Sequence, residues 1–306
     1  MNTRQLQYVL TLAREGSFSR AAETLGISQP SLSQYIRNIE KEIGTELFVR
    51  ASGTVRLTEA GQAYTEAGQD ILSAERQLQN RLSALTEYRS GKIVLGISAH
   101  RSVCLMPPIV REFRTLYPGI RIVLDERPRS VLLDAAEHGE FDLCLTTLPV
   151  DEHLFCCSGV LKEEILLALP ADSPWNERLS AGNDTAGRFP TADIRKLNGC
   201  DFVFLNKDHP VQRILERVCE EQGLCLRESV ECTSLESLIA MVSVGMGAAL
   251  VPSCLRHFCR DADSVRFYSL ADAIPYRDIV LLHRKDQELS RPAAELAALI
   301  QKMSLA

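Results

Sequence analysis

The alternation of apolar and polar positions over residues 1–57 predicts short helices followed by a small β-hairpin. In the third predicted helix the apolar positions recur at intervals of three and four residues: Leu32, Ile36, Ile39 and Ile43. This spacing indicates a helix with one buried face. A tight turn that contains Gly26 joins it to the helix before it. Two short helices joined in this way are typical of a helix-turn-helix, whose second helix enters the major groove of DNA by its N-terminal end.

The start of this second helix carries Pro30 between small polar residues. We expect Ser28 to be the N-cap, which places Pro30 in the first turn, where a missing N–H leaves no bond unmade. The polar face carries the candidate DNA-binding residues Ser28, Gln29, Pro30, Ser31, Ser33, Gln34 and Arg37. Glutamine and arginine read base edges, while serine hydroxyls and free N–H groups suit phosphates. A helical hairpin with a solvated polar face is the alternative interpretation.

The segment after these helices predicts a hairpin. Strands are expected at Leu47–Arg50 and Val55–Leu57. A hairpin that follows a helix-turn-helix is a wing, and we expect Arg50 and Arg56 to contact the phosphate backbone of DNA.

Residues 58–89 contain no proline and predict one long helix. Large apolar residues recur every seven positions along it: Leu57, Tyr64, Ile71, Leu78 and Leu85. A heptad repeat of this length predicts a dimerisation seam between two copies of the helix. Packing of the helix along its own body is the alternative. Two recognition helices related by a two-fold axis would bind a partly palindromic site on double-stranded DNA.

Residues 92–306 alternate strand-like and helix-like segments, which predicts an α/β architecture. In open α/β sheets, ligands bind at the carboxyl ends of the strands. Hydroxyl-bearing segments follow three of the expected strands: residues 98–102, 146–147 and 233–234. These segments are therefore candidates for a ligand site.

The composite motif "FSRAAETLGISQPSLSQYIRNIEKEIGTELFVR", followed by "VRLTEAG", resembles the DNA-binding domain of the LysR-type transcriptional regulators. The resemblance implies a multi-domain fold. An N-terminal all-α winged helix-turn-helix and a long linker helix precede an α/β, periplasmic-binding-protein-like (type II) effector domain of two subdomains. The implied ranges are 1–57, 58–89 and 92–306, with subdomain I at about 92–163 and 270–306 and subdomain II at about 164–269.

By this resemblance, an effector cleft is lined by Ser98, His100, Arg101, Ser102, Thr146, Thr147, Asn206, Thr233 and Ser234. Because His100 and Arg101 place a cation at its mouth, we expect a small anionic, carboxylate-bearing effector. The resemblance also implies a homodimeric or homotetrameric transcription factor that regulates promoters when a small molecule occupies this cleft.

Charge and targeting signals fit this interpretation. The formal net charge is −6, yet residues 1–60 hold seven Lys and Arg against six acidic residues. We therefore expect DNA contacts from this segment rather than from the acidic remainder. The sequence shows neither a secretory segment nor an apolar run of membrane-spanning length, which predicts a cytoplasmic protein without membrane contact.

The chemistry-bearing residues leave two alternatives. The ten cysteines show no CxxC or Cys/His spacing typical of zinc, and we expect reduced core thiols with no metal or cofactor. The first alternative is a thiol-based redox-sensing regulator of the same family. Its reactive thiols would be Cys200, or Cys219 with Cys225. The second alternative is a small-molecule-binding protein or enzyme with a helical appendage. The sequence carries no phosphate loop, nucleophile elbow or metal-spaced cluster, so we assign no catalytic residue and expect no enzyme.

Overall fold

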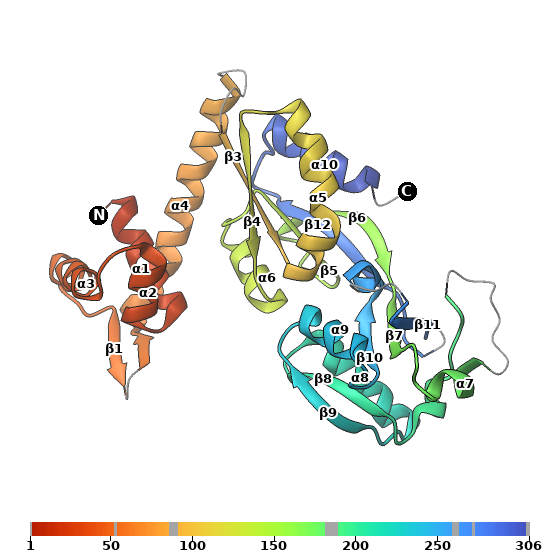
Figure 1. Ribbon diagram of the computed structural model, residues 1–306. Helices are drawn as coiled ribbons and strands as arrows, with labels where there is room; N and C mark the ends of the chain where they lie inside the picture. Colours follow the sequence, from red (N-terminus) through yellow and green to blue (C-terminus); the bar gives the residue numbers. More distant parts are fainter. Residues whose placement is uncertain are drawn as a thin grey trace.

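The computed structural model describes residues 2–51, 54–85, 91–180, 189–258, 263–270 and 273–303. An N-terminal domain lies along a long helix, α4, and an α/β region lies on the other side of that helix (Figure 1). The α/β region has two units. The first unit comprises the described residues of 91–163 and 277–303, and the second comprises those of 165–270. Within the described ranges, no helix has the length and apolar character needed to cross a membrane.

The N-terminal domain is a helical core with a hairpin. Its elements are α1 (Thr3–Glu15), α2 (Phe18–Leu25), α3 (Gln29–Ile43), β1 (Phe48–Ala51) and β2 (Thr54–Leu57). A capping box starts α1, because the side chains of Asn2 and Gln5 each accept a hydrogen bond from the other residue's N–H. The three helices and the hairpin enclose one core, which includes Val9, Leu12, Leu32, Ile36, Ile39 and Leu47.

Ile43 does not belong to the buried face of α3, and this part of the prediction is wrong. Its side chain is 43% exposed, whereas Ile36 and Ile39 are buried. Gly44 ends α3 in a left-handed conformation directly after Ile43. The last turn therefore extends past the core cluster that covers the earlier turns of the helix.

The long helix α4 (Glu59–Leu85) begins where the sequence predicts. Thr58 Oγ1 accepts a hydrogen bond from the N–H of Gly61 at 2.9 Å, which is an N-cap contact. A Cβ at Gly61 would lie 2.0 Å from the carbonyl oxygen of Leu47. Because glycine has no Cβ, α4 can pass this close to the chain that leads into β1, and any other residue at this position would push the two apart.

The first unit is a five-stranded sheet of order β4-β3-β5-β12-β6 with helices on both faces. Its elements are β3 (Gly91–Ile97), α5 (Ala99–Leu116), β4 (Ile120–Glu126), α6 (Arg129–Glu137), β5 (Leu143–Thr147), β6 (Phe155–Glu163), β12 (Arg277–Arg284) and α10 (Arg291–Met303). The strand β3 runs parallel to β4 and β5, while β12 is antiparallel to β5 and β6. Helices α5 and α10 share the core on one face of the sheet, and α6 covers the other.

The second unit contains an antiparallel sheet of order β10-β7-β11 and a parallel pair, β8-β9. Its elements are β7 (Ile165–Pro170), α7 (Trp175–Ser180), η1 (Ile194–Leu197), β8 (Asp201–Leu205), α8 (Pro210–Gln222), β9 (Arg227–Cys232), α9 (Leu235–Ser243), β10 (Ala249–Pro252), η2 (Ser253–Phe258) and β11 (Val265–Ser269). One core, which contains Leu167, Phe202, Leu238 and Leu250, holds these elements together.

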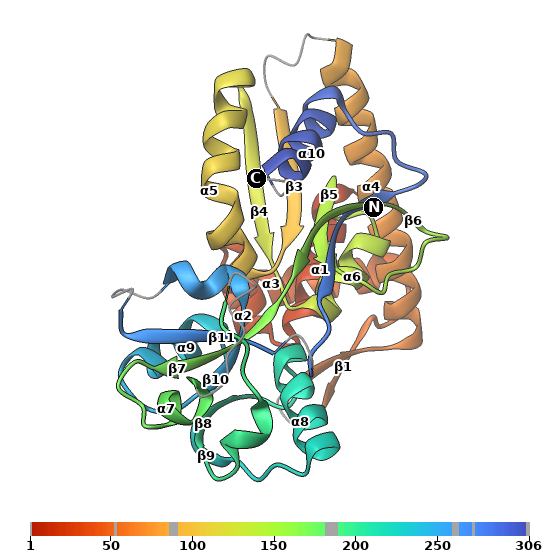
Figure 2. The same ribbon diagram turned by 90° about the vertical axis from the view of Figure 1, so that its right-hand side faces the viewer.

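The chain passes between the two units twice (Figure 2). The first crossing lies between the end of β6 at Glu163 and the start of β7, and the second lies between the end of β11 at Ser269 and the start of β12 at Arg277. In the β12-β6 ladder Arg277 pairs with Glu163, so the two crossings lie side by side. This double connection positions the carboxyl ends of β3, β4 and β5 opposite the second unit.

Candidate functional site

The N-terminal end of α3 is exposed. Ser28 Oγ accepts a hydrogen bond from the N–H of Ser31 at 3.3 Å and lies 2.8 Å from Ser31 Oγ. This N-cap places Pro30 in the first turn of α3, as the sequence predicts. The candidate DNA-binding residues of this helix that the structure leaves exposed are Ser28, Gln29, Pro30, Ser31, Gln34 and Arg37.

Ser33 is the exception, and its assignment to the DNA-facing side is wrong. Its side chain is only 7% exposed. Ser33 precedes Ile36 by three positions, and residues three apart share a helix face, so Ser33 lies over the side that packs against the core. The next residue, Gln34, is exposed and donates from Nε2 to Asn38 Oδ1 at 2.9 Å.

The hairpin after α3 carries an exposed cation. In the antiparallel pair of β1 and β2, Val49 lies opposite Arg56 and Arg50 lies opposite Val55. The side chain of Arg56 is exposed. The side chain of Arg50 and the turn at residues 52–53 lie outside the described part of the structure.

The heptad positions of α4 divide into two groups. Leu57 and Tyr64 are half-buried against the core of the N-terminal domain, so the structure already gives them a partner within the chain. Further along, Ile71 is 41% exposed and Leu78 is 57% exposed. Leu82, which the heptad analysis missed, is 53% exposed, four residues after Leu78. The side chain of Leu85 lies outside the described part, so the exposed apolar stripe consists of Ile71, Leu78 and Leu82.

A cleft of about 400 Å³ lies between the two α/β units. Most of the residues that the sequence assigns to an effector cleft do line it: Ser98, His100, Arg101, Thr147, Asn206, Thr233 and Ser234. Ser102 and Thr146 do not line it. Ser102 is 4% exposed and Thr146 is 1% exposed, so both are packed inside the first unit. The neighbours of these two residues, Arg101 and Thr147, line the cavity instead.

Four helices begin at this cleft. Its lining includes the N-cap residues Ser98 of α5, Pro128 of α6, His209 of α8 and Ser234 of α9. In α5 and α6 no N-cap side chain accepts a hydrogen bond from a backbone N–H of the helix, although Ser98 Oγ accepts one from Arg101 Nη1 at 3.3 Å. Helix N-termini carry partial positive charge and N–H groups without an intrahelical partner, and therefore favour anions.

A buried ion cluster forms the floor of the cleft next to the first crossing. Glu163, whose side chain is 3% exposed, accepts a hydrogen bond from Arg101 at 2.8 Å and another from Arg277. Both guanidinium groups bond the same oxygen, Glu163 Oε2. Burial tends to raise the pKa of Glu163, but the two arginines outweigh burial and lower it. Two cations against one carboxylate leave this cluster with a net positive charge.

Two histidines at the cleft are neutral at physiological pH. Burial, with the positive charge of Arg101, lowers the pKa of His100 to about 3. Burial and the charge of Arg277 lower the pKa of His209 to about 4. His209 Nδ1 accepts a hydrogen bond from the N–H of Val211 at 3.2 Å, which leaves the proton of the neutral ring on Nε2. His209 can therefore donate a hydrogen bond to a ligand.

Arg129, at the start of α6, adds a further cation. In the described part of the chain it donates to neutral oxygens, at 3.0 Å from Nε to Thr147 Oγ1 and at 3.2 Å from Nη2 to the carbonyl of Thr147. Arg127, close by, is instead matched by Asp125 and Glu140, each at 2.7 Å. Arg129 is thus a half-buried cation of this wall whose hydrogen-bond partners in the described residues carry no charge.

Two acidic residues lie at the exposed rim of the cleft, and a third lies inside. Glu126 and Asp208 are exposed, whereas Glu236 is half-buried. Glu236 Oε1 is buried and accepts no hydrogen bond within the described structure. An acceptor in this condition favours a ligand that brings a donor group.

One group near the cleft has metal-ligating side chains. A ring nitrogen of His100, a carboxylate oxygen of Glu163 and Cys254 Sγ all lie within 4.8 Å of one another. Glu163 already accepts hydrogen bonds from two guanidinium groups, and the positive charge of the cluster opposes a further cation. The chemistry of this group therefore favours an anion nearby over a bound metal ion.

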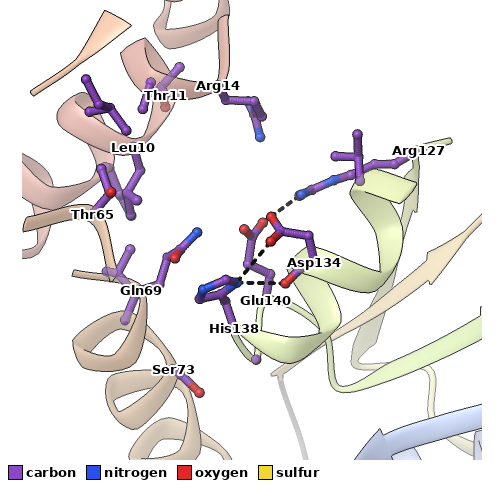
Figure 3. Close-up of a pocket in the computed structure, with 16 residues that line it drawn as sticks. Leu10, Thr11, Arg14, Thr65, Gln69, Ser73, Arg127, Asp134, His138 and Glu140 are labelled. Carbon is purple, nitrogen blue, oxygen red and sulfur yellow. Dashed lines mark hydrogen bonds and ion pairs between the residues drawn. The ribbon is translucent and has the colours of Figure 1, made fainter. Parts of the chain in front are cut away.

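A second cavity of about 400 Å³ lies where the N-terminal domain and α4 meet the first unit (Figure 3). One side of this cavity is formed by Thr11 and Arg14 of α1 and by Gln69 of α4. The segments that follow β4 and α6 form the other side. Its charged groups are largely paired among themselves, as in the contacts of Arg127 with Glu140 and of His138 with Asp134. This cavity lacks the converging helix N-termini of the cleft.

Below this cavity α4 contacts the first unit directly. The hydroxyl of Ser73, which is 6% exposed, accepts a hydrogen bond from Gln287 Nε2 at 3.2 Å. A Cβ at Gly139 would lie 2.4 Å from the same hydroxyl. The long helix is therefore docked on the unit that carries one wall of the cleft.

Comparison with known proteins identifies the family. Residues 3–62 match the bacterial regulatory helix-turn-helix protein, lysR family, and residues 86–304 match the LysR substrate binding domain. The chain belongs to the LysR family. It is a DNA-binding transcription regulator with a C-terminal domain that binds a small-molecule effector.

Relatives of this LysR-family regulator span nearly its whole length. It is 29% identical over 300 residues to the HTH-type transcriptional regulator YcgK of Bacillus subtilis (strain 168), covering 96% of this chain and 92% of that protein. It is 29% identical over 301 residues to the DNA-binding transcriptional dual regulator OxyR of Escherichia coli (strain K12), covering 98% of this chain and 95% of that protein.

Solved structures share the fold. A full-length OxyR variant from Pseudomonas aeruginosa matches with a TM-score of 0.67 and 24% identity, over 98% of this chain and 94% of that chain. Full-length CbnR in complex with its target DNA matches with a TM-score of 0.62 and 18% identity, over 99% of this chain and 100% of that chain.

Sequence reasoning missed part of the cleft wall, namely Pro128, Arg129, His209, Glu236 and Arg277. Arg129 lies three residues after the end of β4 at Glu126, so the rule that selected Ser98, that ligands bind at the carboxyl ends of strands, could have been extended to it. Arg277 lies at the start of an antiparallel strand, and no local signal marks it. Its role depends on the pairing of β12 with β6.

Proposed function

We propose that this LysR-family regulator binds, in the cleft between its α/β units, a small anion that also carries a hydrogen-bond donor, such as a hydroxy- or amino-carboxylate. The observation that supports the anion is the convergence of four helix N-termini with Arg129, whose described partners are neutral. Each of these features favours negative charge for its own electrostatic reason.

The donor group of the effector follows from Glu236. Its buried Oε1 has no hydrogen-bond partner in the described structure, and an unmatched buried acceptor is destabilising. A hydroxyl or ammonium group on the effector would satisfy this oxygen. His209 Nε2–H and Asn206 are the neutral polar groups that would contact the remaining oxygens of the ligand.

The cleft is assigned binding rather than catalysis. Its cations and amide donors attract anions, and the buried Arg101, Glu163 and Arg277 hold one another in place. We infer that the protein is a cytoplasmic regulator rather than an enzyme, because its helix-turn-helix has to meet chromosomal DNA.

The experiment is a thermal-shift screen of small metabolites with the full-length protein. Carboxylates with a hydroxyl or amino group should raise the melting temperature. The substitution Arg129→Ala should lower the affinity for the ligand found in the screen by about ten- to a hundredfold. Arg195→Ala is the matched control, because Arg195 pairs with Asp193 on the surface outside the cleft. Stabilisation by neutral or cationic compounds alone would contradict the anionic effector.

We propose that the exposed face of α3 reads the operator. Gln29, Gln34 and Arg37 would contact base edges, Ser28 and Ser31 would contact phosphates at the helix start, and Arg50 and Arg56 would contact phosphates from the wing. The support is the exposure of the α3 residues and of Arg56 next to a capped helix N-terminus.

We propose that two copies pair through the exposed stripe of α4. Ile71, Leu78 and Leu82 recur at seven and four residues and are unburied in the single chain, as expected of a seam that a second helix covers. Leu78→Glu should shift the protein from dimer to monomer in sedimentation experiments. Glu66→Lys, at an exposed position of α4 outside the stripe, is the control.

A further inference from the structure

Two thiols from different α/β units meet beside the cleft. Cys104 belongs to α5 of the first unit, and Cys254 belongs to η2 of the second. Cys104 Sγ lies 3.4 Å from the backbone oxygen of Cys254, although 150 residues separate the two in the chain. Each thiol also shifts the pKa of the other. Both pack against the core of the second unit, so α5 reaches across the boundary at this point.

The thiol pair adjoins the ion cluster at the first crossing. Cys254 Sγ is 3.9 Å from Glu163 Oε1, the carboxylate oxygen that the two arginines leave open. Arg101, three residues before Cys104 on α5, bonds the other oxygen of Glu163. A covalent change at these sulfurs would therefore act directly on the junction between the two units.

We propose that Cys104 and Cys254 form a reversible disulfide when a hydroperoxide oxidises them, and that this cross-link fixes the two units in the arrangement described here. The site is distinct from Cys200, Cys219 and Cys225, on which the sequence-based redox alternative depends. Only the consequence for regulation rests on the proposed effector function, whereas formation of the bond does not.

The reaction balances as a two-electron oxidation. The Cys104 thiolate attacks one peroxide oxygen, the O–O bond breaks, and a sulfenic acid forms as water or an alcohol leaves. Cys254 sulfur then attacks the sulfur of Cys104, the S–S bond forms, and the sulfenic oxygen leaves as water with the proton of Cys254. In total two thiols lose two protons and two electrons, and one peroxide is reduced.

The environment distinguishes the roles of the two sulfurs. The interaction with the Cys254 side chain is the main reason that the pKa of Cys104 lies below its usual range, and Arg101 contributes in the same direction. The interaction with the Cys104 side chain, with burial, raises the pKa of Cys254. Since the thiolate is the nucleophile and Cys254 Sγ contacts the negatively charged Glu163, Cys104 is assigned the first attack. By contrast, burial raises the pKa of Cys144 and of Cys200 to about 12.

The cross-link would change the response to an effector. In the reduced protein the contact between α5 and η2 is non-covalent, and our proposal requires that the units reorient about the two crossings. A ligand shifts such an equilibrium only through its different affinity for the two arrangements. With the units joined at Cys104 and Cys254, one arrangement remains, and effector binding would no longer change the DNA-binding state.

The test uses full-length protein that is first reduced, freed of metal with EDTA, and then treated with a small excess of hydrogen peroxide. Free thiols are alkylated before tryptic digestion and mass spectrometry without reductant. We expect a linked peptide pair that contains Cys104 and Cys254 and disappears with dithiothreitol. The melting temperature of the oxidised protein should rise by about 5 °C. Cys104→Ser and Cys254→Ser should lose both effects, and Cys225→Ser, at an exposed thiol, should keep them.

Three results would overturn the proposal. The first is oxidation of the exposed Cys156, Cys157 or Cys225 without the expected link in wild-type protein, which requires no variant to fold. The second is a link between other cysteines, such as Cys219 and Cys225. The third is a stoichiometric metal ion, found in protein purified without chelator, that protects Cys254. Operator binding by the reduced protein is measured in parallel, and its failure would count against the proposed function while leaving the disulfide standing.

Discussion

The exposed face of α3 and the floor of the cleft both present polar groups to an anion, but they are constructed in opposite ways. On α3 the groups come from one short segment, are exposed, and bond neighbours three or four positions away, as Ser28 does with Ser31 and Gln34 with Asn38. At the cleft, Arg101, Glu163 and Arg277 come from three distant segments and are mostly removed from water.

This difference predicts how each site responds to mutation. Exposed polar groups are hydrated before they bind, so each contributes modestly to stability and is screened by salt. A buried charge has exchanged water for its protein partners, so removing one member leaves the others uncompensated in a poorly polarisable environment. Mutations on α3 should therefore affect DNA recognition with little change in stability, whereas mutations in the ion cluster should affect stability first.

The largest effect is expected from Glu163→Gln. It leaves the guanidinium groups of Arg101 and Arg277 close together without their carboxylate, and we expect a loss of about 4 kcal/mol in the free energy of unfolding. Denaturant titration of purified protein measures this loss. The control is Asp193→Asn, which breaks an exposed pair with Arg195 and should change stability by less than about 0.5 kcal/mol. Similar losses in both variants would show that the two sites do not differ in the way proposed.

The buried histidines should make stability depend on pH. The pKa values of His100 and His209 are about 3 and about 4 in the folded protein, against about 6.5 in an unfolded chain. Between these values the unfolded state binds more protons, so stability falls as the pH falls below about 6.5, by about 2 kcal/mol for each histidine at pH 5.

Denaturant titrations at pH 7 and pH 5 measure this dependence. The substitution His100→Gln should reduce the loss of unfolding free energy between pH 7 and pH 5. The substitution His153→Gln, at an exposed position, should leave this loss unchanged. An increase in stability between pH 7 and pH 5 that disappears in His100→Gln would mean that His100 is charged in the folded protein and contradict its buried, neutral state.

The smallest effect on stability is expected on α3. Gln34→Ala should leave the melting temperature nearly unchanged and lower discrimination at one operator base pair by about 1–3 kcal/mol. Arg56→Ala should instead weaken binding to all sequences and reduce the salt dependence by about one counterion. Fluorescence anisotropy with operator and scrambled duplexes at several salt concentrations separates the two. Equal losses on both duplexes for Gln34→Ala would remove its base-reading role.

The two regions also differ in how far the sequence predicts them. The N-cap of α3 at Ser28 and the first-turn position of Pro30 were predicted, because these features depend on residues a few positions apart. Ser33 and Ile43 were misplaced, since the extent of the core against which α3 packs is a tertiary property. At the cleft, the rule that ligands bind at the carboxyl ends of strands selected Ser98, Thr147 and Ser234, which line the cavity. The same rule also selected Ser102 and Thr146, which are buried.

The sequence by itself determined the local structure of this protein: its capped helices, its long helix α4, its alternating strands and, through the composite N-terminal motif, its membership of the LysR family. Tertiary structure alone decided which side chains meet across long sequence distances. It paired Arg277 with Glu163 through the β12-β6 ladder, brought Cys104 to Cys254 across the unit boundary, and docked Ser73 of α4 against Gln287. The physical reason is range: capping and periodicity act over one or two turns, whereas burial and ion pairing depend on segments that approach one another only when the chain is folded.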